Sequence, residues 1–128
     1  MPSPRFWTNA AFFMDLPVMF FGLKALVTPA SALVGAGLPS GTTAADQSLA
    51  KGLMRIYGVR NVVIGLTLAQ FWYRGHREAQ GTLMLVMALM PVVDGFAFKE
   101  AIGGGQWQHW AFIPFIAAPG AGLLGWLG

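Results

Sequence analysis

The sequence predicts an all-α integral membrane protein that folds as an antiparallel bundle of four helices. Of its 128 residues, 55% are hydrophobic and only 10% are charged, and the mean hydropathy is +0.58. Soluble domains carry about a quarter charged residues, and a fold this small has little interior in which to bury so much apolar surface. Four apolar segments, each near the ~20 residues that cross a bilayer, account for the excess. We therefore expect a single membrane domain over residues 1–128.

The four helices follow from the alternation of apolar runs with polar or turn-forming stretches. They are expected at about residues 9–27, 49–72, 79–98 and 109–127. The first ends at Thr28, because a residue before proline avoids helical angles. Residues 28–48 are rich in Gly, Pro, Ser and Thr and are expected to form a re-entrant or interfacial loop. The polar segments 73–78 and 99–108 are expected to be the remaining turns.

The first segment also has the alternative interpretation of a cleaved signal peptide, against which the charged Asp15 in its apolar run argues. Aromatic residues that favour membrane interfaces support the four-span arrangement. One face, shared by the termini and the first hairpin, carries Trp7, Trp72, Tyr73 and Trp126, and the opposite face carries Trp107 and Trp110. The distribution of basic residues slightly favours cytoplasmic termini. In a eukaryote, the expected location is the endoplasmic reticulum membrane.

Small residues at helical spacing indicate close packing between helices. They are Gly58, Asn61, Gly65 and Ala69 in the second segment, and Ala117, Ala121 and Gly125 in the fourth. In lipid, such faces let helix backbones approach one another.

Polar residues inside the second apolar segment indicate a functional site. Arg55, Tyr57, Arg60 and Asn61 lie in an otherwise apolar run, where guanidinium groups are costly unless they face a polar interior. The spacing of Tyr57, Arg60 and Asn61 places their side chains on one helical face, whereas Arg55 projects elsewhere.

The number of residues between each polar group and the first hairpin gives its depth in the membrane. At about 1.5 Å per residue, Arg60 lies roughly 18 Å deep, Arg55 roughly 25 Å and Asp94 roughly 24 Å. His109 begins the fourth helix at the same end, and Asp15 lies closer to the level of Arg60. Such a cluster has nearly balanced charge, as burial in a membrane requires. Three alternatives to a buried cluster remain open: Arg55 snorkels to the interface, Asp94 is a polar helix end, and His109 is an interfacial residue.

Several classes of function are disfavoured by composition and spacing. The chain has no cysteine and two separated histidines, so we expect no metal site. No phosphate loop or dinucleotide fingerprint occurs, so we expect no cofactor. The net charge is +3, but the basic residues are scattered, and nucleic-acid binding is not expected.

Four features of the sequence resemble the domain-of-unknown-function 4267 family. They are the run RIYGVRNVVIG at residues 55–65, the polar hairpin after it, Asp94 preceded by Pro91, and the opening of the last segment with Trp107 and His109. These are small four-helix membrane proteins of fungi and bacteria. In many relatives an acid follows the second arginine, where this chain has Asn61. Some fungal members look like tailoring proteins of secondary-metabolite clusters. The resemblance thus implies epoxide opening or cyclisation of an apolar metabolite.

Such a reaction needs an acid at the ring oxygen and a base or an internal nucleophile. Burial in an apolar bundle favours the neutral form of one carboxyl, while another held by arginine stays ionised. The hypothesis makes Asp94 the acid or base, Asp15 the second carboxylate, Arg55 and Arg60 the charge partners, and Tyr57, Asn61 and His109 orienting or proton-transfer groups.

The expected partners are an apolar small-molecule substrate and membrane lipid. Two other classes stay open at this point. A non-catalytic scaffold or lipid-binding subunit would use the same charged pairs to fix helix register. A small transporter would require oligomerisation, because four helices show no inverted repeat. Homo-oligomerisation is itself an open alternative.

Overall fold

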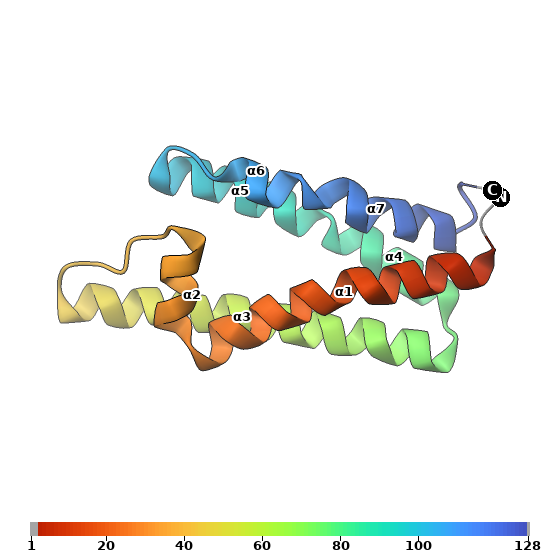
Figure 1. The fold of residues 1–128 in the computed structure, drawn as a ribbon, viewed down its shortest axis with the longest axis horizontal. Coiled ribbons are helices and arrows are strands. Elements are labelled where there is room, and N and C mark those ends of the chain that lie inside the picture. The colour runs from red at the N-terminus through yellow and green to blue at the C-terminus, as the bar shows by residue number, and fades with distance from the viewer. Residues whose placement is uncertain (1–2, 128) are drawn as a thin grey trace. The chain divides into compact units, whose positions relative to one another are not determined.

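A computed structural model describes residues 3–127, and over this range the chain is helical without strands, which confirms the all-α prediction (Figure 1). The helices are α1 (Pro4–Val27), α2 (Pro29–Ala36), α3 (Ala44–Arg74), α4 (Arg77–Met87), α5 (Leu89–Ile102), α6 (Gln106–Trp110) and α7 (Phe112–Leu123). Single residues, Ala88 and Ala111, separate α4 from α5 and α6 from α7. The described chain therefore has five helices, two of which are interrupted.

The prediction of a loop over residues 28–48 is wrong for its first part, which forms α2. Pro29 occupies the first helical turn, where its missing N–H is no loss. The helix ends at Gly37, whose positive φ of 71° lets the chain turn. There the Leu38 N–H donates to the Leu33 carbonyl and the Gly37 N–H to the Val34 carbonyl, both at 3.0 Å. This paired pattern is a common helix end, in which the apolar residues at its two ends pack together.

Helix α3 begins at Ala44, five residues before the predicted start, because its first turn is capped by side chains. The Asp46 N–H donates to the Thr43 hydroxyl oxygen at 3.1 Å, and the Thr43 N–H donates to the Asp46 carboxylate at 3.2 Å. These reciprocal bonds satisfy two amide groups that a helix start leaves open. The helix thus extends beyond the apolar run on which the prediction depended.

The first hairpin is shorter than predicted. Tyr73 and Arg74 belong to α3, Arg77 and Glu78 belong to α4, and only Gly75 and His76 lie between the helices. Gly75 has a φ of 71°, and the His76 N–H donates to the Phe71 carbonyl at 2.9 Å. The second hairpin is likewise confined to residues 103–105.

Prolines explain the interruptions of the last two long helices. A proline ring clashes with the carbonyl four residues earlier and removes one helical hydrogen bond. For Pro91 this carbonyl belongs to Met87, and for Pro114 it belongs to Trp110. The breaks at Ala88 and Ala111 directly follow those two residues. The predicted fourth helix, 109–127, is accordingly observed as α6 and α7, which together run from residue 106 to 123.

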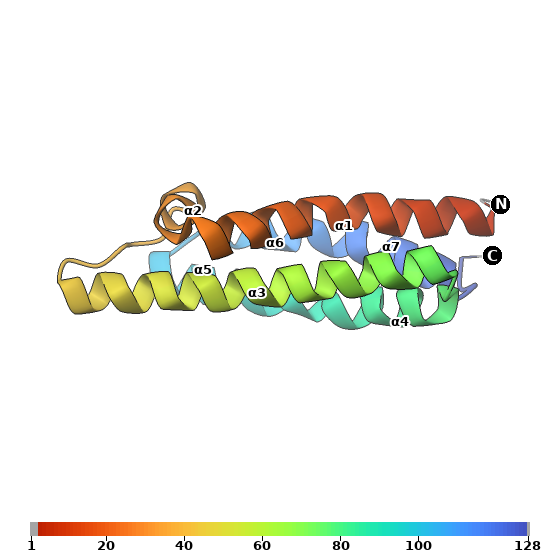
Figure 2. The ribbon, with the colours of Figure 1, turned by 90° about the horizontal axis from the view of Figure 1, so that it is seen from below.

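The chain divides into two compact units. The first, residues 16–67, contains the end of α1, all of α2 and most of α3. The end of α1 runs antiparallel to α3, and α2 turns across their direction (Figures 1 and 2). A Cβ on Gly58 would lie 2.6 Å from the Gly22 carbonyl oxygen, so the two backbones touch there. Beside this crossing Ala25, Leu33 and Met54 form a small apolar core.

The second unit contains the start of α1 and the chain from Leu68 onward. Within it α4 packs against α7, and α5 packs against α6. Gly81 and Gly120 make the close approach of α4 to α7, since a Cβ on either would lie 3.0 to 3.1 Å from the other's carbonyl oxygen. The predicted packing face of the last segment is thus displaced, because Gly120 is buried and Gly125 is exposed.

The start of α1 is held in the second unit by aromatic residues. Trp72 stacks on Phe12 with ring centroids 4.4 Å apart, and its indole N–H donates to the Asn9 amide oxygen at 3.2 Å. The Trp7 indole lies over Gly122, where no side chain would fit.

Two helices of the described chain have the length and apolarity of membrane spans, Pro4–Val27 and Arg77–Ile102, the latter being α4 and α5 together. Many of their large apolar side chains are exposed, among them Phe13, Phe20 and Val93. Helix α3 has 31 residues but does not meet the same criteria. Its apolar stretch is interrupted by the arginines and Asn61 on which the site prediction depends.

Candidate functional site

The predicted site residues divide between the two units. Arg55, Tyr57, Arg60 and Asn61 lie on α3 in the unit of residues 16–67, whereas Asp15, Asp94 and His109 belong to the other unit. Each group has its own local geometry.

On α3, Tyr57 and Arg60 lie on the same face, as their spacing predicts. The Arg60 guanidinium carbon is 5.1 Å from the centre of the Tyr57 ring, which is the geometry of a cation–π contact. Tyr57 also packs against the core of Ala25, Leu33 and Met54. Arg60 is half-buried, while Arg55 is exposed. The aromatic contact therefore orients Arg60 relative to the core of its unit.

Asn61 is buried at the crossing of α1 and α3. Only 4% of its surface is exposed, and a Cβ on Gly22 would lie 2.7 Å from the Asn61 Cβ. Its amide oxygen has no hydrogen-bond partner among the described residues. A buried acceptor left open costs stability, so this amide is a group that a donor on a bound molecule would satisfy.

Asp94 and His109 lie on the paired helices α5 and α6. The His109 ring lies 4.3 Å from the ring of Phe98, which follows Asp94 by one helical turn. The Trp110 indole N–H donates to the Val92 carbonyl at 3.3 Å, and the indole covers Gly95 so closely that no Cβ would fit. The pairing therefore places His109 beside the stretch of α5 that begins at Asp94. Asp94 and His109 are both half-buried.

Asp15 has the most unusual surroundings of the predicted residues. It is 1% exposed, and both carboxyl oxygens are buried without a hydrogen-bond partner among residues 3–127. It follows the fully buried Ala11 by one helical turn, so it lies on the inner face of α1. An isolated charge at such a place is very costly, whereas a neutral carboxyl costs much less.

Gln80 is a buried polar residue that the sequence reasoning missed. It is 0% exposed, its amide nitrogen donates to the Thr8 carbonyl at 3.3 Å, and its amide oxygen has no partner among the described residues. It is the second residue of the predicted helix 79–98 and directly follows Ala79, next to the polar run 73–78. The available signal was its helical spacing to Met84 and Met87, which are buried on the same face of α4.

Metal-binding groups do not gather within the described chain: no three His, Cys, Asp or Glu side chains come together between residues 3 and 127. The donors and acceptors available for chemistry are thus carboxyls, amides, guanidinium groups, a phenol and an imidazole. Such a set suits proton transfer and the orientation of a polar atom in an apolar substrate.

Comparison with known proteins gives a family without an assigned activity. No curated protein and no solved structure matches the chain. A family model described as "Domain of unknown function (DUF4267)" matches residues 16–123. The match includes the α3 group, Asp94 and His109, and begins one residue after Asp15. Because it spans most of the sequence, the chain belongs to the DUF4267 family.

Proposed function

We propose that this protein is an integral membrane enzyme that opens or cyclises epoxides of apolar metabolites by acid–base catalysis. The membrane location is supported by two helices of spanning length and by the many large apolar side chains on their surfaces. In this proposal the interrupted helix of α6 and α7 and the polar α3 complete an antiparallel bundle of four spans. Polar helices are tolerated in bilayers when their polar side chains face a protein interior.

The observation that carries the enzymatic proposal is the burial of Asp15. A carboxyl that is 1% exposed and lacks a described partner contributes nothing evident to stability. Buried polar residues that do not stabilise the fold are expected at functional sites. A neutral carboxyl in an apolar site is also the general acid that an epoxide oxygen needs.

Asp94 is the proposed second carboxyl. It belongs to the same unit as Asp15 but is half-buried, so its surroundings suit an ionised base better than those of Asp15 do. In the proposed reaction the oxygen of water, or of a hydroxyl of the substrate, attacks one ring carbon, and the bond from that carbon to the ring oxygen breaks. Asp15 gives its proton to the ring oxygen, and Asp94 accepts the proton of the attacking oxygen. Return of a proton from Asp94 to Asp15 through water restores both carboxyls. His109 assists that transfer. Arg55, Tyr57, Arg60 and Asn61 belong to the other unit and take no part in this step.

A non-catalytic scaffold is the second candidate. It is favoured by the close glycine crossings, which show that much of the small-residue pattern serves helix packing. In a scaffold, replacing either aspartate affects assembly at most and leaves every metabolite unchanged.

The test is metabolite profiling by mass spectrometry of the native host with the gene deleted. The strain is complemented with wild type, Asp15→Asn, Asp94→Asn, or the exposed-acid control Glu100→Gln. We expect an epoxide or uncyclised precursor to accumulate and to be cleared by wild type and Glu100→Gln only. Full rescue by both aspartate variants would refute the enzymatic proposal. Alkaline extraction tests the location separately, since an integral protein stays in the membrane pellet.

A further inference from the structure

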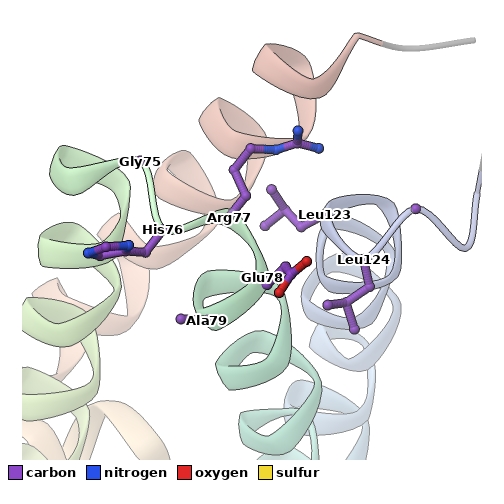
Figure 3. Close-up of a pocket in the computed structure, with 8 residues that line it drawn as sticks. Gly75, His76, Arg77, Glu78, Ala79, Leu123 and Leu124 are labelled. Atoms are coloured by element: carbon purple, nitrogen blue, oxygen red, sulfur yellow. The ribbon is translucent and has the colours of Figure 1, made fainter.

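A cavity of about 640 Å³ lies in the second unit, between the first turn of α4 and the end of α7 (Figure 3). Its volume is within the range of roughly 300–1,000 Å³ of small-molecule sites. None of the predicted catalytic residues lines it. The cavity is therefore separate from the proposed catalytic residues.

The charged groups of the cavity have opposite signs. Figure 3 shows Glu78 pointing from α4 toward the α7 end, whereas the Arg77 side chain extends past Leu123, away from Glu78, and His76 points toward α3. The His76 ring meets the Phe71 ring at 6.4 Å. Neither the Arg77 guanidinium nor the Glu78 carboxylate has a hydrogen-bond or ion-pair partner among residues 3–127. The site thus offers one cation and one anion beside an apolar wall.

The position of the cavity matches the headgroup level of a bilayer. The apolar span Arg77–Ile102 begins at this end, so Arg77 and Glu78 lie at its boundary. Interfacial aromatic residues of the same unit are exposed here, with Tyr73 at the end of α3 and Trp126 just after α7. This step rests on the membrane location proposed above, but not on the enzymatic activity.

We propose that this cavity binds the headgroup of phosphatidylethanolamine. The Arg77 guanidinium takes the phosphate through charge-assisted hydrogen bonds, which are stronger than neutral ones. The Glu78 carboxylate accepts hydrogen bonds from the primary ammonium, and Leu123 and Leu124 cover the glycerol end of the acyl chains. A choline headgroup has no N–H to donate to Glu78. The headgroup of phosphatidylglycerol carries the same phosphate but ends in a neutral glycerol, so it has no positive charge to pair with the Glu78 carboxylate.

The test is native mass spectrometry of the purified full-length protein in maltoside detergent, titrated with phosphatidylethanolamine, phosphatidylcholine or phosphatidylglycerol. We expect tightest binding of phosphatidylethanolamine. Arg77→Gln and Glu78→Gln should each weaken it roughly tenfold, the effect of losing one charge-assisted bond. Glu78→Gln should also remove the preference over phosphatidylcholine. Arg74→Gln is the matched control, because Arg74 is an exposed arginine in the last turn of α3, outside the cavity lining.

Equal binding of the three lipids, tighter binding of phosphatidylglycerol, or unchanged binding by Arg77→Gln would overturn the proposal. Soluble phosphoethanolamine separates the two sources of this headgroup. Displacement of the lipid by micromolar phosphoethanolamine would identify a free phosphoester as the ligand and would also overturn it. Circular dichroism confirms that each variant is folded. Because both aspartates are retained, the lipid result can be read whether or not the protein is an enzyme.

Discussion

Gly58→Ala should destabilise the protein, although alanine is the better helix former. The added Cβ would lie 2.6 Å from both the Gly22 carbonyl oxygen and the Leu26 amide nitrogen. Both atoms are backbone, so no side-chain rotation relieves the overlap and α1 must move away from α3. Overpacking of this kind costs about 1–3 kcal/mol, and a backbone clash belongs at the upper end. The gain in helix propensity offsets about 1 kcal/mol, which leaves a net loss of about 2 kcal/mol.

Gly52→Ala is the matched control on the same helix. A Cβ at Gly52 meets no heavy atom within 4 Å, so only the propensity gain of about 1 kcal/mol applies. The two substitutions should therefore differ by about 3 kcal/mol in the free energy of unfolding. Titration of detergent-solubilised protein with sodium dodecyl sulfate, followed by circular dichroism, measures that difference. If Gly58→Ala proves as stable as Gly52→Ala, the backbones of α1 and α3 do not touch at Gly58.

Three further predictions test other parts of the chain. Hydrogen bonds with Thr43 lower the pKa of Asp46, and the bond with the Thr43 side chain has a larger effect than the bond with its backbone. The stability that these bonds contribute is complete above the pKa of the unfolded state and is lost as the pH falls through the lower pKa of the folded state. Thermal unfolding of wild type and Asp46→Asn against pH should show the acid-dependent loss in wild type only. Gly95→Ala should displace the Trp110 indole from the Val92 carbonyl and red-shift tryptophan emission, whereas Gly104→Ala, which meets nothing within 4 Å, should not. Asp15→Leu should raise the free energy of unfolding by about 1–3 kcal/mol, because it removes a buried polar group without a described partner. A decrease in the free energy of unfolding of that size would mean that the carboxyl has a hydrogen-bond partner.

The sequence was informative where a feature depends on spacing along one helix. The shared face of Tyr57 and Arg60 and the small-residue face around Gly58 follow from helical periodicity, and both are observed. Helix ends were harder to predict. Helix α2 lies in a stretch whose Gly, Pro and Ser content suggested a loop, yet Pro29 starts this helix and Gly37 ends it.

Interruptions and buried polar residues were harder still. Pro91 is visible in the sequence, but its effect falls three residues earlier, at Ala88. Gln80 was missed because it is a polar residue at the start of the predicted helix 79–98, next to the polar hairpin, while the structure buries it where α4 meets α7 and the start of α1. Its burial depends on contacts with residues far away in the chain, which periodicity along one helix does not encode.

The two units share an arrangement that links packing to chemistry. Each has a pair of facing glycines, Gly22 with Gly58 and Gly81 with Gly120, and each has a buried amide beside that pair. Asn61 follows Gly58 by three residues, and Gln80 directly precedes Gly81. Both amide oxygens are buried without a hydrogen-bond partner within the described chain. In the function proposed above, each oxygen is an acceptor for a hydrogen bond from a hydroxyl of the substrate. In each unit a buried amide therefore lies next to the point where two helix backbones meet.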